Sequence, residues 1–156
     1  MTTISFKNVG IKKFESQNDL LTRSLKPIGI QTPVQYGSQG EGLFRMYYDL
    51  GNQIQDNLKN LILTNHGERL GLYDLGGNLQ PLLSEFSNKD DFDSEAMVRI
   101  NTATSKYMPF VSLIGFDSLP EYENNQFVGR ISIMVIYSVP DLNVFERNLN
   151  IILNII

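Results

Sequence analysis

Cysteine is absent from this sequence of 156 residues, and histidine occurs once, as His66. Without cysteine the chain can form no disulfide bond, no thiolate nucleophile and no cysteine-bound zinc or iron–sulfur site, and its composition fits a reducing compartment. A single histidine has no second histidine or cysteine with which to share a metal ion. We therefore expect no metal site and no cofactor.

Long apolar runs are also missing. None approaches the ~20 residues of a membrane span, and the start Met-Thr-Thr-Ile lacks the basic and then apolar segments of a signal peptide. Lys and Arg number 13 against 17 Asp and Glu, which gives a net charge of −4 and no broad basic surface. We expect a protein that is assembled in a cytoplasm and contacts neither nucleic acid nor a membrane.

The rest of the composition is that of a globular protein. Hydrophobic residues make up 42% of the chain and charged residues 19%. A chain of this length can bury a core in one domain. We therefore predict a single folded domain over 43–156, preceded by an N-terminal segment, 1–42, of different character.

An amphipathic helix is predicted over 49–65. Asp49 can cap its start, and Gly67 can end it in the left-handed conformation. The predicted buried face repeats at intervals of three and four residues, and the predicted solvent face lies between those positions. The buried face is Leu50, Ile54, Leu58, Leu61 and Ile62, and the solvent face is Gln53, Gln55, Asp56, Lys59 and Asn60.

A glycine-rich segment follows this helix. The run 69–74 favours an extended crossing, and Gly76-Gly77 turns the chain. Asn78 is expected to cap a short helix that ends at Glu85. Its inward side chains are Leu79, Leu82, Leu83 and Phe86.

A further helix is predicted after an acidic linker at 88–93. Glu95 is expected in its first turn, where the helix dipole favours an anion, and Pro109 ends it. Its inward positions repeat at helical spacing and are Ala96, Ile100, Ala103 and Tyr107.

The last third of the chain is predicted to form strands. Val111 to Phe116 is apolar and β-branched, and Phe127 to Val139 alternates between apolar and polar residues. Pro120 to Gln126 is expected to be the hairpin loop. From Arg147 the chain alternates again; a helix over 142–153 competes with a strand here, and we choose the strand. The fold class is α+β: two main helices and a short helix packed on a small, mainly antiparallel C-terminal sheet.

The N-terminal segment shows little periodicity. Ile4, Phe6 and Val9 hint at a short strand, and prolines 27 and 33 favour extended geometry. Two interpretations remain: an extended arm that lies on a neighbouring molecule, or a loosely held terminus. Leu20, Leu21 and Leu25, with Asp19 as cap, could form a helical turn or two.

Several motifs occur in a fixed order along the central stretch. Asn57-Leu58, Asn60-Leu61 and Leu63-Thr64 come first, then Gly67-Glu68-Arg69, Asp74 with Gly76, and Leu82-Leu83 with Glu85. These residues resemble the baseplate wedge protein, or sheath initiator, of contractile-tailed bacteriophages and its type VI secretion counterpart. The resemblance is strong over 43–86 and weaker but collinear to the C-terminus, although Ser84 and Leu75 replace aromatic residues of the family pattern. The N-terminal elements of the pattern also have matches, at Arg23, Leu25, Pro27 to Ile30, and Leu43-Phe44. The resemblance therefore favours an extended N-terminal arm over 1–42.

The resemblance implies a structural virion protein of the tail baseplate, present in multiple copies of a sixfold assembly. It implies binding to other wedge proteins, with tube or hub proteins as further possible partners. A Glu-Pro-Arg tripeptide of the family is linked to docking on the helical core bundle of the wedge. Here that position reads Met108-Pro109-Phe110, so either docking is apolar or this role does not carry over. The wedge-binding residues expected from the resemblance are Asn57, Glu68, Arg69, Asp74, Glu85, Met108, Pro109 and Phe110.

A terminal strand with no proline or lysine and no following segment leaves an edge open for pairing with another chain. The resemblance implies that the partner is the tail sheath protein, bound by strand addition that templates the first sheath ring. The residues expected to bind sheath are Asn148, Leu149, Asn150, Ile151, Ile152, Leu153, Asn154 and Ile155.

Two alternatives differ from this hypothesis. The chain could be a wedge adaptor that never contacts sheath. It could instead cleave peptidoglycan with a carboxylate pair such as Glu68 with Asp74 or Glu85, because some relatives have carried a lysozyme label. Any chain with 17 acidic residues supplies such pairs, so we expect no enzyme and no catalytic residue.

Overall fold

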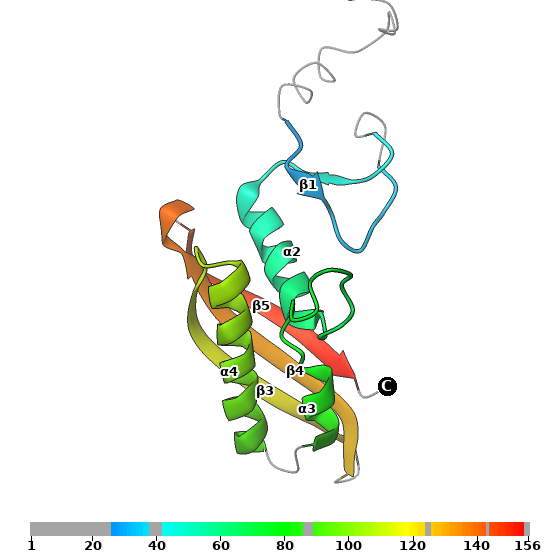
Figure 1. The fold of residues 1–156 in the computed structure, drawn as a ribbon, viewed down its shortest axis with the longest axis vertical. Coiled ribbons are helices and arrows are strands. Elements are labelled where there is room, and N and C mark those ends of the chain that lie inside the picture. The colour runs from blue at the N-terminus through cyan, green and yellow to red at the C-terminus, as the bar shows by residue number, and fades with distance from the viewer. Residues whose placement is uncertain (1–25, 38–41, 86–88, 124–125, 143, 155–156) are drawn as a thin grey trace, which may run out of the picture. The chain divides into compact units, whose positions relative to one another are not determined.

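The computed structural model describes residues 26–37, 42–85, 89–123, 126–142 and 144–154 (Figure 1). Several sequence predictions lie outside these residues: the strand at Ile4 to Val9, the helical turns at 19–25, Phe86, Asn88 and Ile155. The chain divides into two compact units, Met1–Leu50 and Gly51–Ile156. The boundary between an N-terminal arm, 1–42, and a folded domain, 43–156, stays a prediction.

The described part of the first unit is a small antiparallel ladder. Strand β1 (Gly29–Ile30) pairs with β2 (Met46–Tyr47), and Tyr36 bridges to Phe44. Several of its apolar side chains are exposed, which is unusual for a unit that stands alone. They include Ile28, Ile30, Val34, Tyr36 and Leu43.

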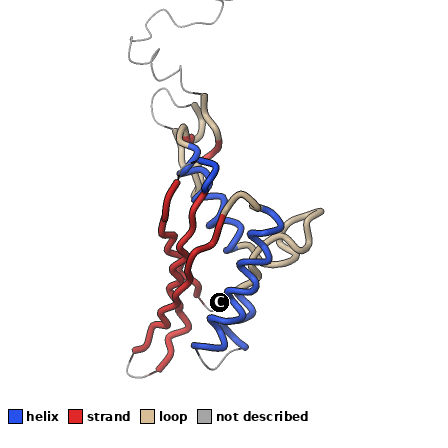
Figure 2. The backbone as a smooth tube through the Cα atoms, turned by 90° about the vertical axis from the view of Figure 1, so that its left-hand side faces the viewer, coloured by secondary structure: helices blue, strands red, loops and turns tan. Residues whose placement is uncertain are grey.

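The second unit is a two-layer α+β fold, as the sequence predicts. Helices α2 (Leu50–Leu63), α3 (Gln80–Glu85) and α4 (Lys89–Tyr107) lie on one face of a three-stranded antiparallel sheet. The sheet has the order β3-β4-β5, and Figure 2 shows the two layers side by side. Its strands are β3 (Ser112–Glu123), β4 (Gln126–Val139) and β5 (Val144–Asn154), with the 3-10 turn η2 (Pro140–Leu142) between the last two.

The core lies between these layers. Alternate residues of β4 from Ile131 to Val139 are buried, and Ile131, Ile133 and Val135 pair with buried residues of β5. The helices contribute the other half of the core, which includes Leu58, Ile62, Leu82, Ala96 and Ile100. The prediction of a strand at the C-terminus is therefore confirmed, because a period of two puts Leu149, Ile151 and Leu153 against the helices.

Helix α2 buries most of the predicted face but differs at two positions. Asp56, expected on the solvent side, is buried, and Leu50 at the helix start is exposed. Gly51 is buried beside Arg147 of β5, and a β-carbon there would lie 3.0 Å from the guanidinium. An alanine at position 51 would therefore require the Arg147 side chain to shift by a few tenths of an ångström.

The segment after α2 is a compact loop, so the predicted extended crossing at 69–74 is wrong. Gly67 has a positive φ of 86°, and its N–H donates to the carbonyl of Tyr73 at 2.7 Å, which closes the loop. Hydrogen bonds between Leu72 and Arg69 and between Leu75 and Leu72 tighten it further. Glycines at 67, 71 and 76 all have positive φ, and this is why the run turns instead of extending.

The loop returns to the end of α2 and satisfies its free carbonyls. The N–H of Gly77 donates to Leu61 at 3.0 Å, and the N–H of Asn78 donates to Thr64 at 3.2 Å. Gly76 has a φ of 121°, and a β-carbon there would overlap the Thr64 carbonyl. Glycine is therefore required by both conformation and space.

Asn78 is not the cap of α3, contrary to the prediction. It has a φ of 48°, and its side chain accepts the N–H of His66 at 3.3 Å. The start of α3 is instead capped by Asn65, whose Oδ1 accepts the N–H of Gln80 at 3.2 Å. A cap 15 residues away in sequence leaves no local signal.

Two further boundaries differ from the sequence prediction. Helix α4 begins at Lys89, so the acidic run is its first turn and not a linker, and Glu95 lies beyond that turn. The carboxylates of Asp90 and Asp91 suit the positive end of the helix dipole, and Phe92 enters the core. Strand β3 extends through Pro120 to Glu123, where a loop was expected. Proline is tolerated there because β3 is an edge strand.

We expect Gly76→Ala to lower the free energy of unfolding by about 2–4 kcal/mol, because the added methyl group combines a steric clash with a strained φ. Gly71→Ala is the matched control: its φ is 80°, but no atom lies within 4 Å of the added carbon. It should cost about 1 kcal/mol. Equal losses in urea unfolding would show that the approach of Gly76 to Thr64 is unimportant.

Candidate functional site

The C-terminal strand β5 forms one edge of the sheet, as expected. Its odd-numbered residues, such as Leu149 and Ile151, are buried under the helices. Its even-numbered side chains face away from the helices and are exposed: Asn148, Asn150, Ile152 and Asn154. The structure therefore separates the predicted sheath-binding set into core side chains and accessible ones, and Ile155 lies outside the described residues.

The backbone of the same even-numbered residues points to the open edge. Gln55 of α2 donates its Nε2 to the carbonyl of Asn148 at 3.5 Å, and Gln80 of α3 donates to the carbonyl of Asn154. Since peptide groups alternate between the two sides of an antiparallel strand, the N–H and C=O groups of Asn150 and Ile152 share this outward direction. Between the two glutamine contacts, they form the central part of the edge.

Arg147 fixes the start of this edge against α2. Its Nη1 donates to Oδ1 of Asn52 at 3.2 Å, and its register partner on β4 is Tyr137. Burial raises the pKa of the Tyr137 phenol, and the positive charge of Arg147 acts in the opposite direction. Burial of the phenol thus outweighs the effect of the guanidinium and favours the protonated form.

A second candidate surface is the loop between α2 and α3. The carboxylate of Glu68 accepts two hydrogen bonds from Asn65, one from the backbone N–H and one from the side chain, both at 2.9 Å. The backbone hydrogen bond is the main reason that the pKa of Glu68 is lowered. Glu68 therefore shapes the loop, while the Arg69 side chain beside it is exposed and has no hydrogen-bonded partner among the residues that the structure describes.

Asp74 joins this loop to the end of α4. It forms an ion pair with Lys106 and accepts the phenol of Tyr107 at 2.8 Å. The hydrogen bond from Lys106 and then that from Tyr107 lower the pKa of Asp74 to about 2, and the same contact raises the pKa of Lys106. All these groups are at the surface, so the contact orients the loop without being buried.

The tip of the loop carries apolar residues that sequence patterns did not single out. Leu70 is fully exposed, and Leu72 and Tyr73 are exposed beside it. Large apolar side chains gathered on a projecting loop are characteristic of a surface that contacts another protein. The sequence signal for this surface was the group of leucines within a glycine-rich run. The sequence pattern predicts an extended crossing for that run and not a projecting loop.

The other predicted wedge-binding residues do not form one cluster with this loop. Asn57 is exposed on α2 and accepts a hydrogen bond from Gln53 at 2.8 Å. Glu85 ends α3 close to the start of α4, whereas Asp74 contacts the end of α4. A helix of 19 residues is about 28 Å long, so the two carboxylates lie far apart. Met108 is buried, while Pro109 and Phe110 are exposed. Docking at this tripeptide would therefore use the last two residues.

The carboxylates proposed for peptidoglycan cleavage have lowered pKa values at Glu68 and Asp74. A general acid for glycoside cleavage requires a raised pKa. Within the described ranges, no group of three or more His, Cys, Asp or Glu side chains could hold a metal ion. In the same part of the chain, no helix has the length and hydropathy to cross a membrane.

Asp74 should make stability depend on pH at the acid end. Its ordinary pKa of 3.8 falls to about 2 on folding, so the stabilisation is complete above about pH 4 and is lost as pH falls towards 2. Asp74→Asn removes this contribution. We expect the gap between the urea midpoints of wild type and Asp74→Asn to close over that range. A gap that stays constant would show that the ionised carboxylate does not stabilise the fold.

Comparisons with known proteins identify shared folds. No protein-family model matches the sequence, and no curated protein matches it. The crystal structure of a "putative tail lysozyme" from Geobacter sulfurreducens aligns with a TM-score of 0.55 and 19% identity, over 69% of this chain and 93% of that one. A chain in the cryo-EM structure of the anti-feeding prophage baseplate aligns with a TM-score of 0.59 and 16% identity, over 77% of this chain and 90% of that one. The protein thus shares its fold with a chain of a 6-fold symmetrised baseplate.

Proposed function

We propose that this protein is a structural component of the baseplate of a contractile tail or a tail-like particle. In this role it would join the wedge and template the first ring of sheath through its C-terminal sheet. It would be assembled in the host cytoplasm and remain in the particle in several copies. The open β5 edge, on a fold shared with a baseplate chain, is the observation that carries the proposal.

Strand addition suits the chemistry of this edge. The outward N–H and C=O groups of Asn150 and Ile152 can pair with an incoming backbone, and the exposed side chains of both residues can fix its register. The side chain of Ile152 is 58% exposed and offers apolar contact at the centre of the strand. An incoming strand longer than these residues would replace the contacts of Gln55 and Gln80 with backbone hydrogen bonds.

Wedge binding is assigned to the loop between α2 and α3 and to Pro109-Phe110. Leu70 and Tyr73 supply apolar contact area, and Arg69 offers a planar pair of donors to a carboxylate. Asp74 holds the loop to α4, next to the segment that contains Phe110. The two segments would then act as one docking surface.

The wedge adaptor that never contacts sheath is the main alternative. Such an adaptor would bind wedge proteins through the same loop, but its β5 edge would have no role. An assay of sheath assembly therefore distinguishes the two proposals. The name of the Geobacter protein also raises peptidoglycan cleavage. The lowered pKa values of Glu68 and Asp74 do not favour that chemistry, so we do not propose it as the function.

We expect Asn150→Pro to prevent ordered sheath from forming on the protein. Proline removes one N–H that faces the open edge, and the bonds between β5 and β4 are made by the alternate residues. The assay is co-expression with the sheath protein of the same genome, scored by electron microscopy for ordered sheath. Asn150→Thr is the control, because it keeps the N–H and has high strand propensity.

Ile152→Lys is a second edge variant. Its side chain is exposed, so the charge should leave the core intact while opposing strand pairing. Thermal unfolding establishes that each variant is folded. If folded Asn150→Pro and folded Ile152→Lys both nucleate sheath as wild type does, the β5 edge is not the interface and the adaptor interpretation holds.

Leu70→Asp should weaken binding to purified wedge proteins of the same genome by about tenfold or more, because it places a charge in an apolar contact. Its thermal midpoint should not change, since Leu70 is fully exposed. Leu119→Asp is the control, because it introduces the same charge at an exposed apolar position of β3. Equal affinities for the two variants in calorimetry would remove the loop from the docking surface.

A further inference from the structure

An apolar groove runs between α4 and β3, apart from the surfaces described above. Its volume is about 450 Å³, and its walls are mostly apolar. Met97 and Val98 of α4 and Ile114 of β3 are each about half exposed along it. The main lining side chains are Met97, Val98, Ile100, Leu113, Ile114 and Phe116. The groove is therefore open and lined like a binding site for apolar side chains.

The groove lies beside the second open edge of the sheet, because β3 is the other terminal strand. Pro120 pairs in register with Ile131 but has no N–H to donate to β4. A proline within an edge strand belongs where the missing N–H would face outward. By alternation, the N–H and C=O groups of Phe116 and Ser118 also face the open edge. An extended segment could thus pair with β3 and place alternate side chains in the groove.

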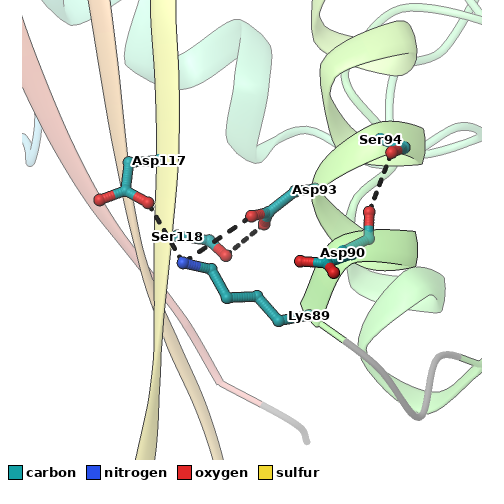
Figure 3. A network of polar contacts seen from close by, with 6 residues as sticks. All are labelled: Lys89, Asp90, Asp93, Ser94, Asp117 and Ser118. Atoms are coloured by element: carbon teal, nitrogen blue, oxygen red, sulfur yellow. Dashed lines mark hydrogen bonds and ion pairs between the residues drawn. The ribbon is translucent and has the colours of Figure 1, made fainter.

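The N-terminal end of α4, next to β3, is acidic. Figure 3 shows Lys89 between Asp117 and Asp93, and the hydroxyl of Ser118 donates a hydrogen bond to Asp93. The Nζ of Lys89 lies 3.3 Å from the carboxylate of Asp117 and 3.9 Å from that of Asp93. Asp90 and Asp91 are exposed in the same turn of the helix. Four carboxylates against one ammonium favour a basic segment at this end.

We infer that the groove binds residues 1–14 of a second copy of this chain, added as a strand to the open edge of β3. This segment contains Ile4 and Phe6 at strand spacing, the lysines 7, 12 and 13, and no acidic residue before Glu15. The alternating apolar side chains match the groove, and the positive charge matches its acidic end. The availability of neighbouring copies rests on the proposed baseplate function.

The absence of cysteine makes this inference testable by disulfide trapping in the full-length chain. Phe6→Cys is mixed with an equal amount of differently tagged Ile114→Cys under mild oxidation, and heterodimers are counted on non-reducing gels. We expect them to form at least about tenfold faster than with Leu119→Cys, because binding raises the local concentration of the two thiols. Leu119 is a matched control, since it is exposed on the same strand but faces away from the groove.

Two variants complete the test. Met97→Lys, which puts a charge into the groove, should abolish the advantage of Ile114→Cys over Leu119→Cys. The double variant Phe6→Cys with Ile114→Cys should give linked dimers, and their yield should fall when the oxidation is carried out at lower protein concentration. Equal rates for the two partners, no effect of Met97→Lys, or a monomer linked within one chain would each overturn the inference. The disulfide trapping uses no sheath protein. A negative trapping result therefore does not change the outcome of the sheath assay, and a negative sheath assay does not change the meaning of the trapping result.

Discussion

The pairing of β4 with β5 is the interaction on which the rest of the structure depends. β4 is the central strand, and its buried residues Ile131, Ile133 and Val135 pair with Leu153, Ile151 and Leu149 of β5. The helices pack on these side chains. The same strand β5 has its other backbone groups at an open edge, so one segment completes the core and offers an interface. The two roles are compatible because they use alternate residues.

The helical layer is held to this sheet by contacts that also shape the surface. Glycines 76 and 77 let the chain fold back against the last turn of α2, and Asp74 ties the loop to the end of α4 through Lys106 and Tyr107. These constraints leave Leu70 and its neighbours projecting from the fold. A loop that is anchored at its base and apolar at its tip is suited to docking without a large rearrangement on binding.

Regular periodicity explains which parts of the fold could be predicted from the sequence. The spacing of Leu58, Leu61 and Ile62 predicts α2, and the alternation through Ile131, Ile133 and Val135 predicts β4, because each pattern is set by burial on one side. The loop at 64–79 could not be predicted, since its hydrogen bonds join residues such as Asn65 and Gln80 that lie far apart in sequence. The start of α4 was missed because acidic residues suit both a linker and the first turn of a helix. The groove between α4 and β3 depends on tertiary packing and on a bulge near Ile114, for which the sequence has no periodic signal.

We propose that β5 binds sheath through its outward backbone, and amide hydrogen exchange can detect this contact residue by residue. In the free protein the amides of Asn150 and Ile152 should exchange faster than those of Leu149 and Ile151, because only the N–H groups of the latter are directed at β4 and hydrogen-bonded to it. On addition of the sheath protein from the same genome, the account predicts slowed exchange at Asn150 and Ile152 and little change at Leu149 and Ile151. Binding of sheath that leaves Asn150 and Ile152 unprotected would contradict it.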